Sequence, residues 1–296
     1  MPPGKTHHIH AASVFAASDF PLAVMRLARH GDVRLHDHAF HELVLIMGGT
    51  GRHLTAHGAY ALRAGDVFLI RGATRHGYVN TRDLCLTNIL FDPRRLGLPL
   101  PGLDLGTVPG FHALFRIGPS MRQAGRPGMR LGLSLAQLEG ADGMIADLEE
   151  ELRRRQPGCR FMACSHLMRL IGFLSRAYSG DGAGHAEPGL GISRVLGHME
   201  QHYAEPLTVK QLARIAGMSE SSFMRRFRET IGRSPIDYLI QARIRKACDL
   251  LRGETVLKLQ DVAMRCGFDD GNYFSRRFRL VTGYAPRAYR EASRMG

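Results

Sequence analysis

Histidines and a carboxylate gather in one short stretch of the chain, GDVRLHDHAFHELVLIMGG, residues 31–49. His36, His38 and Glu42 share parity, so on one extended strand their side chains point to the same face. His76 follows in GDVFLIRGATRHGYVN, residues 65–80. Three imidazoles and a carboxylate on neighbouring strands form a donor set for Zn, Fe, Mn or Ni. We therefore expect one polar site, either a divalent-metal centre, a metal-free pocket or a group of structural histidines.

A second group of chemically capable residues lies in a repeat near the C-terminus. The segments LARIAGMSESSFMRRFRETIGRSP (212–235) and VAMRCGFDDGNYFSRRFRLVTGYAP (262–286) share residues at a nearly constant offset. Phe223 and Phe227 match Phe274 and Phe278, and the Arg-Arg pair between them is repeated. The chain therefore contains the same structural unit twice.

Each copy is predicted to form a helix, a tight turn and a second helix. In the first copy Thr208 and Gln211 form a capping box, Gly217 supplies a left-handed turn and Ser219 caps the second helix. In the second copy Lys258 replaces the capping threonine. Between the copies, Ser234 caps and Pro235 begins a long helix through Leu251.

The second helix of each copy is amphipathic. Its apolar stripe is Phe223, Phe227 and Ile231 in the first copy and Phe274, Phe278 and Val281 in the second. The opposite face is polar in both copies and carries Ser221, Met224, Arg225 and Arg228, then Asn272, Ser275 and Arg276. Arginine contacts guanine O6 and N7 in a bidentate manner, and asparagine does the same with adenine. These faces therefore predict two recognition helices that bind double-stranded DNA.

Charge and cysteine content agree with a DNA-binding protein of the cytoplasm. The net charge is +13, and residues 191–296 hold 19 basic and 11 acidic side chains, a net of +8. The N-terminus lacks the apolar core of a signal peptide, and no apolar run is long enough to span a membrane. The five cysteines form no CxxC pair, so neither a disulfide framework nor a zinc finger is expected.

The chain is expected to fold as an α+β protein of two domains. Short apolar runs at 42–47, 67–70 and 84–90, separated by glycine-rich turns, predict a β-barrel over residues 1–135. Helical periodicity predicts helices over residues 136–178. We expect these helices to form a dimer interface, and the alternative is that they pack against their own barrel. A linker at 179–191 precedes the all-α DNA-binding domain, residues 192–296.

The C-terminal repeat closely resembles the DNA-binding domain of the AraC/XylS family, over about residues 193–293. The resemblance implies a domain that places both recognition helices in successive major-groove segments. It makes Tyr273 a base-edge candidate beside Asn272 and Arg276, and assigns Met224 an apolar contact with a thymine methyl group. The predicted DNA-binding residues are Ser221, Ser222, Met224, Arg225, Arg228, Asn272, Tyr273, Ser275, Arg276 and Arg279.

The spacing of the N-terminal histidines resembles the two motifs of the cupin barrel, although Arg71 and Ala73 replace the usual proline and glycine. The segments HDHAFHELVLIMGGTGRH and DLCLTNILF resemble those of rhamnose-responsive regulators, which implies a sugar effector. A barrel of this size can hold one small ligand. The predicted ligand-binding residues are His36, His38, Glu42, His76, Tyr78 and Asn88.

Together these features predict a sequence-specific transcription factor that responds to a small molecule and is not an enzyme. Its expected partners are double-stranded DNA, a sugar-like effector, RNA polymerase and a second copy of the chain, with no membrane. No cofactor is assigned with certainty, and a divalent metal in the cupin pocket is the one candidate. The alternative is a metal-dependent cupin enzyme fused to a DNA-binding domain.

Overall fold

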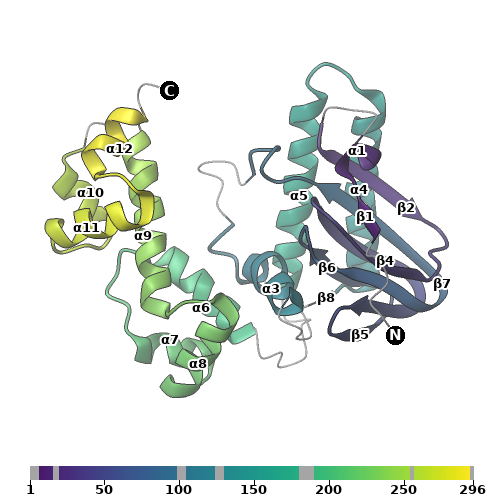
Figure 1. Cartoon of the computed structure of the whole chain (residues 1–296), viewed down its shortest axis with the longest axis horizontal. Helices are drawn as coiled ribbons and strands as arrows, with labels where there is room; N and C mark the ends of the chain where they lie inside the picture. Colours follow the sequence, from purple (N-terminus) through teal and green to yellow (C-terminus); the bar gives the residue numbers. More distant parts are fainter. Residues whose placement is uncertain are drawn as a thin grey trace. The chain divides into compact units, whose positions relative to one another are not determined.

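The chain forms two compact units. The computed structural model describes residues 7–15, 20–98, 105–123, 130–179, 190–253 and 257–293. The units are Met1–Gly189 and Leu190–Gly296. The first contains the sheet and the second is helical (Figure 1). The predicted α+β class with two domains is confirmed, while most of the predicted linker, residues 180–189, lies outside the described residues.

The first unit is built on one eight-stranded sheet. Its strands are β1 (His7–Ile9), β2 (Leu22–Leu27), β3 (Val33–His38), β4 (His41–Thr55), β5 (Gly58–Leu62), β6 (Asp66–Ile70), β7 (His76–Phe91) and β8 (Leu131–Gly132). The three apolar runs that predicted strands lie within β4, β6 and β7.

Strands β4 and β7 pair antiparallel from His41–Phe91 at one end to Thr55–His76 at the other. The two halves of this long ribbon have different neighbours. β4 pairs with β6 through its first half and with β5 through its second, while β7 pairs with β3 near its start and with β2 near its end. The sheet therefore rolls into the cupin-like domain that the motif spacing implied.

The rolled sheet is buried on both faces at β4. Val44 and Ile46 belong to an apolar cluster inside the roll with Phe68 and Leu86. The intervening Leu43 and Leu45 are likewise fully buried on the opposite face. Helices cover the outside: α3 contacts β6, α4 contacts β2 and α5 contacts β8.

The helices of the first unit are α1 (Ala11–Val14), α2 (Pro109–Phe111), the π-helix η1 (His112–Ile117), α3 (Gly118–Gln123), α4 (Leu135–Arg154) and α5 (Cys159–Ser179). Ser134 and Gln137 form a capping box at the start of α4. Arg26 of β2 binds two carboxylates of α4, those of Asp142 at 2.5 Å and Glu149 at 2.8 Å. This pair of contacts fastens the helix to the sheet.

The second unit consists of helices α6 (Leu190–Gln201), α7 (Val209–Ala216), α8 (Glu220–Ile231), α9 (Pro235–Arg252), α10 (Leu259–Arg265), α11 (Gly271–Thr282) and α12 (Pro286–Ala292). Thr208 and Gln211 cap α7 reciprocally, and Ser234 caps α9 with Pro235 as its first residue. Lys258 provides no side-chain cap for α10. All three capping predictions are confirmed.

The long helix α9 carries the core of the second copy. Its residues Ile244 and Leu251 pack in one buried cluster with Phe274 and Phe278 of α11. The prediction that Val281 also points inward is wrong, because its side chain is 39% exposed. Val281 lies in the last turn of α11, beyond the part of the helix that this cluster covers.

The two turn glycines are equivalent in sequence but not in surroundings. Gly217 (φ +67°) and Gly267 (φ +79°) both adopt the left-handed conformation. A Cβ added at Gly217 would meet nothing within 4 Å, whereas one at Gly267 would lie 2.6 Å from the carbonyl oxygen of Ala204. The second turn is therefore closed against the backbone that precedes α7, and the first is open.

We predict that Gly267→Ala destabilises the protein more than Gly217→Ala. The left-handed backbone costs an alanine about 1–2 kcal/mol at either position. The clash with Ala204 adds a further ~1–3 kcal/mol at Gly267 only. Urea unfolding of both full-length variants, followed by far-ultraviolet circular dichroism, measures the difference. Equal losses would mean that the close approach at Ala204 is not maintained in solution.

Candidate functional site

Helices α8 and α11 each divide into a buried and an exposed face. Phe223 and Phe227 are 0% exposed on α8, and Phe274 and Phe278 are 1% and 0% exposed on α11. The residues predicted to bind DNA lie on the other side of each helix, where most of them are exposed to solvent. Ser222 and Met224 are half-buried.

The exposed faces of the two helices match position by position. Ser221, Met224, Arg225 and Arg228 of α8 correspond, 51 residues later, to Asn272, Ser275, Arg276 and Arg279 of α11. Spacings of three, four and seven residues place each set of four along one face of its helix. Each helix therefore presents two arginines, one turn apart, on the side opposite its phenylalanines.

The two arginines of the Arg-Arg pair in α11 differ in their surroundings. Arg225 and Arg276 are exposed, and neither forms an ion pair among the described residues. Arg277, the neighbour of Arg276, is half-buried, and its guanidinium lies 3.5 Å from the carboxylate of Asp237 on α9. In α11, Arg276 is therefore the arginine of the pair that is available to a ligand.

The start of α11 is organised by local contacts. Asp270 accepts hydrogen bonds from the backbone amides of Asn272 and Tyr273. The Arg276 guanidinium lies 5.5 Å above the Tyr273 ring, a cation–π contact that orients both side chains. The Ser275 hydroxyl donates to the carbonyl oxygen of Gly271 at 2.9 Å, so it serves the helix backbone. Among the serines predicted to bind DNA, Ser275 therefore uses its hydroxyl hydrogen within its own helix.

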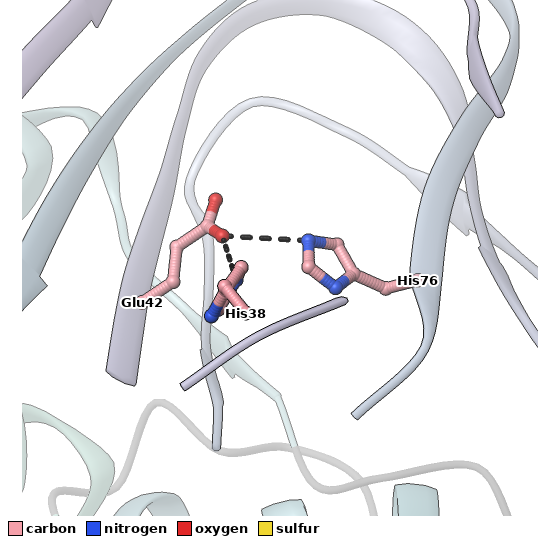
Figure 2. A group of neighbouring side chains, drawn as sticks. All are labelled: His38, Glu42 and His76. Atoms are coloured by element: carbon pink, nitrogen blue, oxygen red, sulfur yellow. Dashed lines mark hydrogen bonds and ion pairs between the residues drawn. The ribbon is translucent and has the colours of Figure 1, made fainter. Parts of the chain in front are cut away.

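Three residues of the rolled sheet meet around one carboxylate oxygen. Nε2 of His38 lies 3.0 Å from Oε2 of Glu42, and Nε2 of His76 lies 3.4 Å from the same oxygen (Figure 2). The three side chains come from β3, β4 and β7, and are 1%, 4% and 0% exposed. All three lie within mutual reach of a single metal ion. The sequence-based prediction that they meet is confirmed.

The strand arrangement predicted for these residues is wrong in one respect. His36, His38 and Glu42 do not lie on one extended strand, because β3 ends at His38 and β4 begins at His41. Glu42 therefore reaches the histidines from the following strand.

The other predicted ligand-binding residues lie at increasing distance from the cluster. The His36 ring centroid is 4.2 Å from that of His76, and Tyr78 is 6.5 Å from His76. Asn88 pairs with Val44, two residues along β4 from Glu42, and is 6% exposed. Its Oδ1 is buried and has no hydrogen-bond partner among the described residues. Asn88 therefore adds an unsatisfied acceptor inside the sheet.

Burial and contacts within the cluster shift the pKa values of His36, Glu42 and His76. Desolvation alone would raise the pKa of Glu42, but the hydrogen bonds with His38 and His76 outweigh it and the pKa is lowered. Desolvation opposes protonation of His76 as well, yet the Glu42 carboxylate raises its pKa. Burial and the neighbouring His76 lower the pKa of His36. The carboxylate is thus held ionised, and it favours positive charge beside it.

Sequence reasoning missed His53, which is 2% exposed and whose ring lies 5.5 Å from Tyr78 and 5.8 Å from His76. Its parity on β4 is opposite to that of Glu42, so simple alternation would direct it outward. The β4–β7 register shifts between Ile46 and Arg52 and reverses the alternation. Glycine pairs such as Gly48-Gly49 in a long strand are the only hint of such a bulge in the sequence.

The described residues contain no helix long and apolar enough to cross a membrane.

Both sites lie within segments that match known domain families. Residues 25–101 match the AraC-like ligand binding domain, and residues 212–292 match a helix-turn-helix domain. The first segment contains the histidine cluster, and the second contains α8 and α11.

Whole-chain relatives are transcription regulators. The chain is 32% identical over 257 residues to the HTH-type transcriptional activator RhaR of Escherichia coli K12 and of Shigella flexneri, covering 86% of each protein. Among solved structures, it is 36% identical to the DNA-binding domain of the global transcriptional factor AdpA in complex with target DNA. That match covers 35% of this chain and 93% of the other, with a TM-score of 0.34. The chain therefore belongs to the AraC family of ligand-responsive, DNA-binding transcription regulators.

Proposed function

We propose that this regulator reads its operator with the exposed faces of α8 and α11. The observation that carries the proposal is the positional match of the two faces, each backed by buried phenylalanines. Arg225 and Arg276 suit bidentate contacts with guanine, and Asn272 suits adenine. Met224 suits a thymine methyl group. Ser221, Ser222 and Tyr273 contribute further contacts near the helix starts.

Arg228 and Arg279 lie one turn farther along their helices than the base-reading arginines. In a helix that enters the major groove with its N-terminal end, residues farther along approach the sugar-phosphate backbone. We assign these two arginines to phosphates. Such contacts position the protein without carrying sequence information.

We further propose that a polyol effector, of the sugar class, binds at the histidine cluster. The support is a buried set of polar groups: the Glu42 carboxylate and Asn88 Oδ1 can accept from hydroxyls, and His36, His38 and His76 can face the same ligand. Buried polar groups of this kind are costly unless a partner satisfies them. Tyr78 would line the same space.

The helices α4 and α5 are proposed as the dimer interface. α5 exposes Phe161 by 73% and Met162 by 42% near its start. Apolar side chains so exposed in neighbouring positions favour contact with a second chain. Because Arg26 fastens α4 to β2, a change in the sheet would reach this interface directly. We also propose that the protein activates transcription by contacting RNA polymerase, since the relatives are transcriptional activators by name.

A cupin-type metal-dependent enzyme is the alternative, and the His38–Glu42–His76 group is the observation in its favour. The two functions make different demands on that group. An enzyme would turn over its sugar, whereas a sensor returns it unchanged. Incubation of the purified protein with the sugar that it binds, followed by chromatography of the sugar, separates them. We propose the sensor, in line with the regulators to which the whole chain is related.

Arg225→Ala and Arg276→Ala should each relax base preference at one operator position and weaken specific binding by ~1–3 kcal/mol. Arg228→Ala and Arg279→Ala are the matched controls. They should weaken binding to all sequences alike and reduce the salt dependence. Selection of bound sequences from a random pool, with each purified variant, gives the preference. An unchanged preference in both Arg225→Ala and Arg276→Ala would contradict base reading by these helices.

Asn88→Leu should weaken sugar binding by about tenfold, the value of one hydrogen bond, without lowering the stability of the protein. Removing an unsatisfied buried acceptor is neutral or stabilising, whereas a bound polyol loses its partner. Calorimetry with L-rhamnose and related sugars, together with the melting temperature, tests both statements. Thr87→Val is the control, since Thr87 is equally buried but faces the other side of β7. Equal sugar affinity in wild type and Asn88→Leu would place the effector elsewhere.

Phe161→Glu should shift the protein toward monomer in sedimentation equilibrium, raising the dissociation constant at least about a hundredfold. Burying an unpaired charge in an apolar interface is strongly unfavourable. Met264→Glu provides the control, because Met264 is also largely exposed, at 64%, but lies on α10 of the second unit, outside the proposed interface. A dimer that survives Phe161→Glu would rule out the start of α5 as the interface.

A further inference from the structure

The two copies of the helix-turn-helix repeat meet at a joint segment, residues 203–205, which lies between α6 and α7. Gly267, in the turn before α11, comes so close to this segment that an added Cβ would lie 2.6 Å from the carbonyl oxygen of Ala204. The joint segment is turn and bend backbone beyond the end of α6. Its carbonyl groups therefore need partners outside that helix.

One arginine of α9 supplies two of those partners. Nε of Arg243 donates to the carbonyl oxygen of Tyr203 at 2.7 Å, and Nη2 donates to that of Glu205 at 2.8 Å. A guanidinium presents its N–H groups in a rigid planar fork, so two acceptors at fixed positions also fix its orientation. The side chain is half-buried, and the two carbonyls satisfy donors that would otherwise be costly to take out of water.

The same guanidinium faces the second copy. Its Cζ lies 5.7 Å from the centre of the Phe268 ring, within the range of a cation–π contact. Phe268 is 3% exposed and belongs to the buried cluster that contains Phe274 and Phe278 of α11. Burial lowers the pKa of Arg243, and the carboxylate of Asp269, which precedes α11, opposes that shift. One side chain thus contacts the backbone of the first copy and the core of the second.

Helix α9 holds the two copies by separate contacts. On the side of the first copy, the hydroxyl of Tyr238 donates to the buried carboxylate of Glu200 on α6 at 2.8 Å. On the side of the second copy, Ile244 and Leu251 pack in the core around α11. Because α9 has 18 residues and is therefore about 27 Å long, two bodies attached to its two parts can rock against each other unless they also touch. Arg243 provides such a direct connection.

DNA makes this connection matter. Successive major-groove segments on one face of the duplex are one helical turn apart, about 34–36 Å. One extra base pair between them moves the second segment by about 3.4 Å and rotates it by about 35° around the axis. Two recognition helices that are rigidly joined therefore fit one spacing, and two that can rock fit several.

We propose that Arg243 is a positioning residue that sets the spacing specificity of this regulator. By connecting the joint segment to the second copy, it holds α8 and α11 at one separation, so the protein accepts a single spacing between the two segments of its operator. This inference rests on the proposed reading of DNA by both helices.

The test compares operators that differ only in spacing. The full-length wild type selects its operator from a random pool, and versions with one base pair inserted or removed between the two segments are then made. A misplaced recognition helix loses several base contacts, each worth about 5–150-fold in affinity, so the wild type should lose at least about a hundredfold on either version. Arg243→Met keeps the apolar stem but donates neither hydrogen bond. Since its second copy can rock into register, it should lose about tenfold or less in the same fluorescence-anisotropy titration.

Arg252→Met is the matched control. Arg252 also lies on α9, donates to the hydroxyl of Tyr289 at 2.7 Å and lies 5.7 Å from the centre of that ring. Tyr289 belongs to α12 of the same copy, so this variant removes an equal charge without opening the joint, and it should keep the full hundredfold loss. Circular dichroism melts establish that both variants fold. If Arg243→Met does not fold, Arg243→Lys takes its place with the same expected result, because an ammonium keeps the charge but has no planar fork.

Three results would overturn the proposal: a wild type that tolerates altered spacing, an Arg243 variant that keeps the hundredfold loss, or equal tolerance in Arg252→Met. The base preferences from the same selection separate this failure from that of the proposed function. If Arg225→Ala and Arg276→Ala each change the preference in one of two selected segments, reading by both helices stands whatever the spacing result. If the wild type selects fewer than two segments, the proposed function itself fails.

Discussion

The antiparallel pairing of β4 with β7 is the constraint on which the first unit depends. These strands pair along almost their whole length, yet Glu42 lies near the start of β4 and His76 at the start of β7, at opposite ends of the ribbon. Only a sheet that rolls can bring those ends within 3.4 Å. The register shifts between Ile46 and Arg52 increase the local bending and twist. The cluster is thus a consequence of how the sheet closes. Binding of a ligand there would therefore depend on the closed arrangement of the sheet.

The second unit depends on repetition joined by one long helix. α9 contributes core residues to the second copy and holds Asp237, which pairs with Arg277 of α11. One arginine of the repeated pair, Arg277, therefore fixes α11 on its scaffold, and the other, Arg276, is left exposed for the proposed contact with DNA. The copies are not identical in packing, because the turn at Gly267 closes against Ala204 while the turn at Gly217 is open. Helix α11 is accordingly held by more contacts outside its own copy than the turn at Gly217 provides for α8.

A regulator of this kind must make binding of a small molecule alter an interaction elsewhere, which requires a different ligand affinity in the two states. The first unit has a physical route for this. The buried cluster joins three strands, and Arg26 of β2 holds α4 by two carboxylates. A ligand that tightens the sheet therefore acts on the helices proposed to meet a second chain.

Much of this protein was determined locally by its sequence. The capping box at Thr208, the left-handed turn at Gly217 and the phenylalanine stripe of α8 depend on residues a few positions apart, so they could be predicted, as could the repeat. Motif spacing also predicted correctly that His38, Glu42 and His76 meet, although the parity argument on a single strand did not hold. Tertiary structure alone decided the rest. The break between β3 and β4, the inward turn of His53 and the exposure of Val281 depend on strand register and on where a core ends. These are set by contacts between distant segments, and no local pattern encodes them.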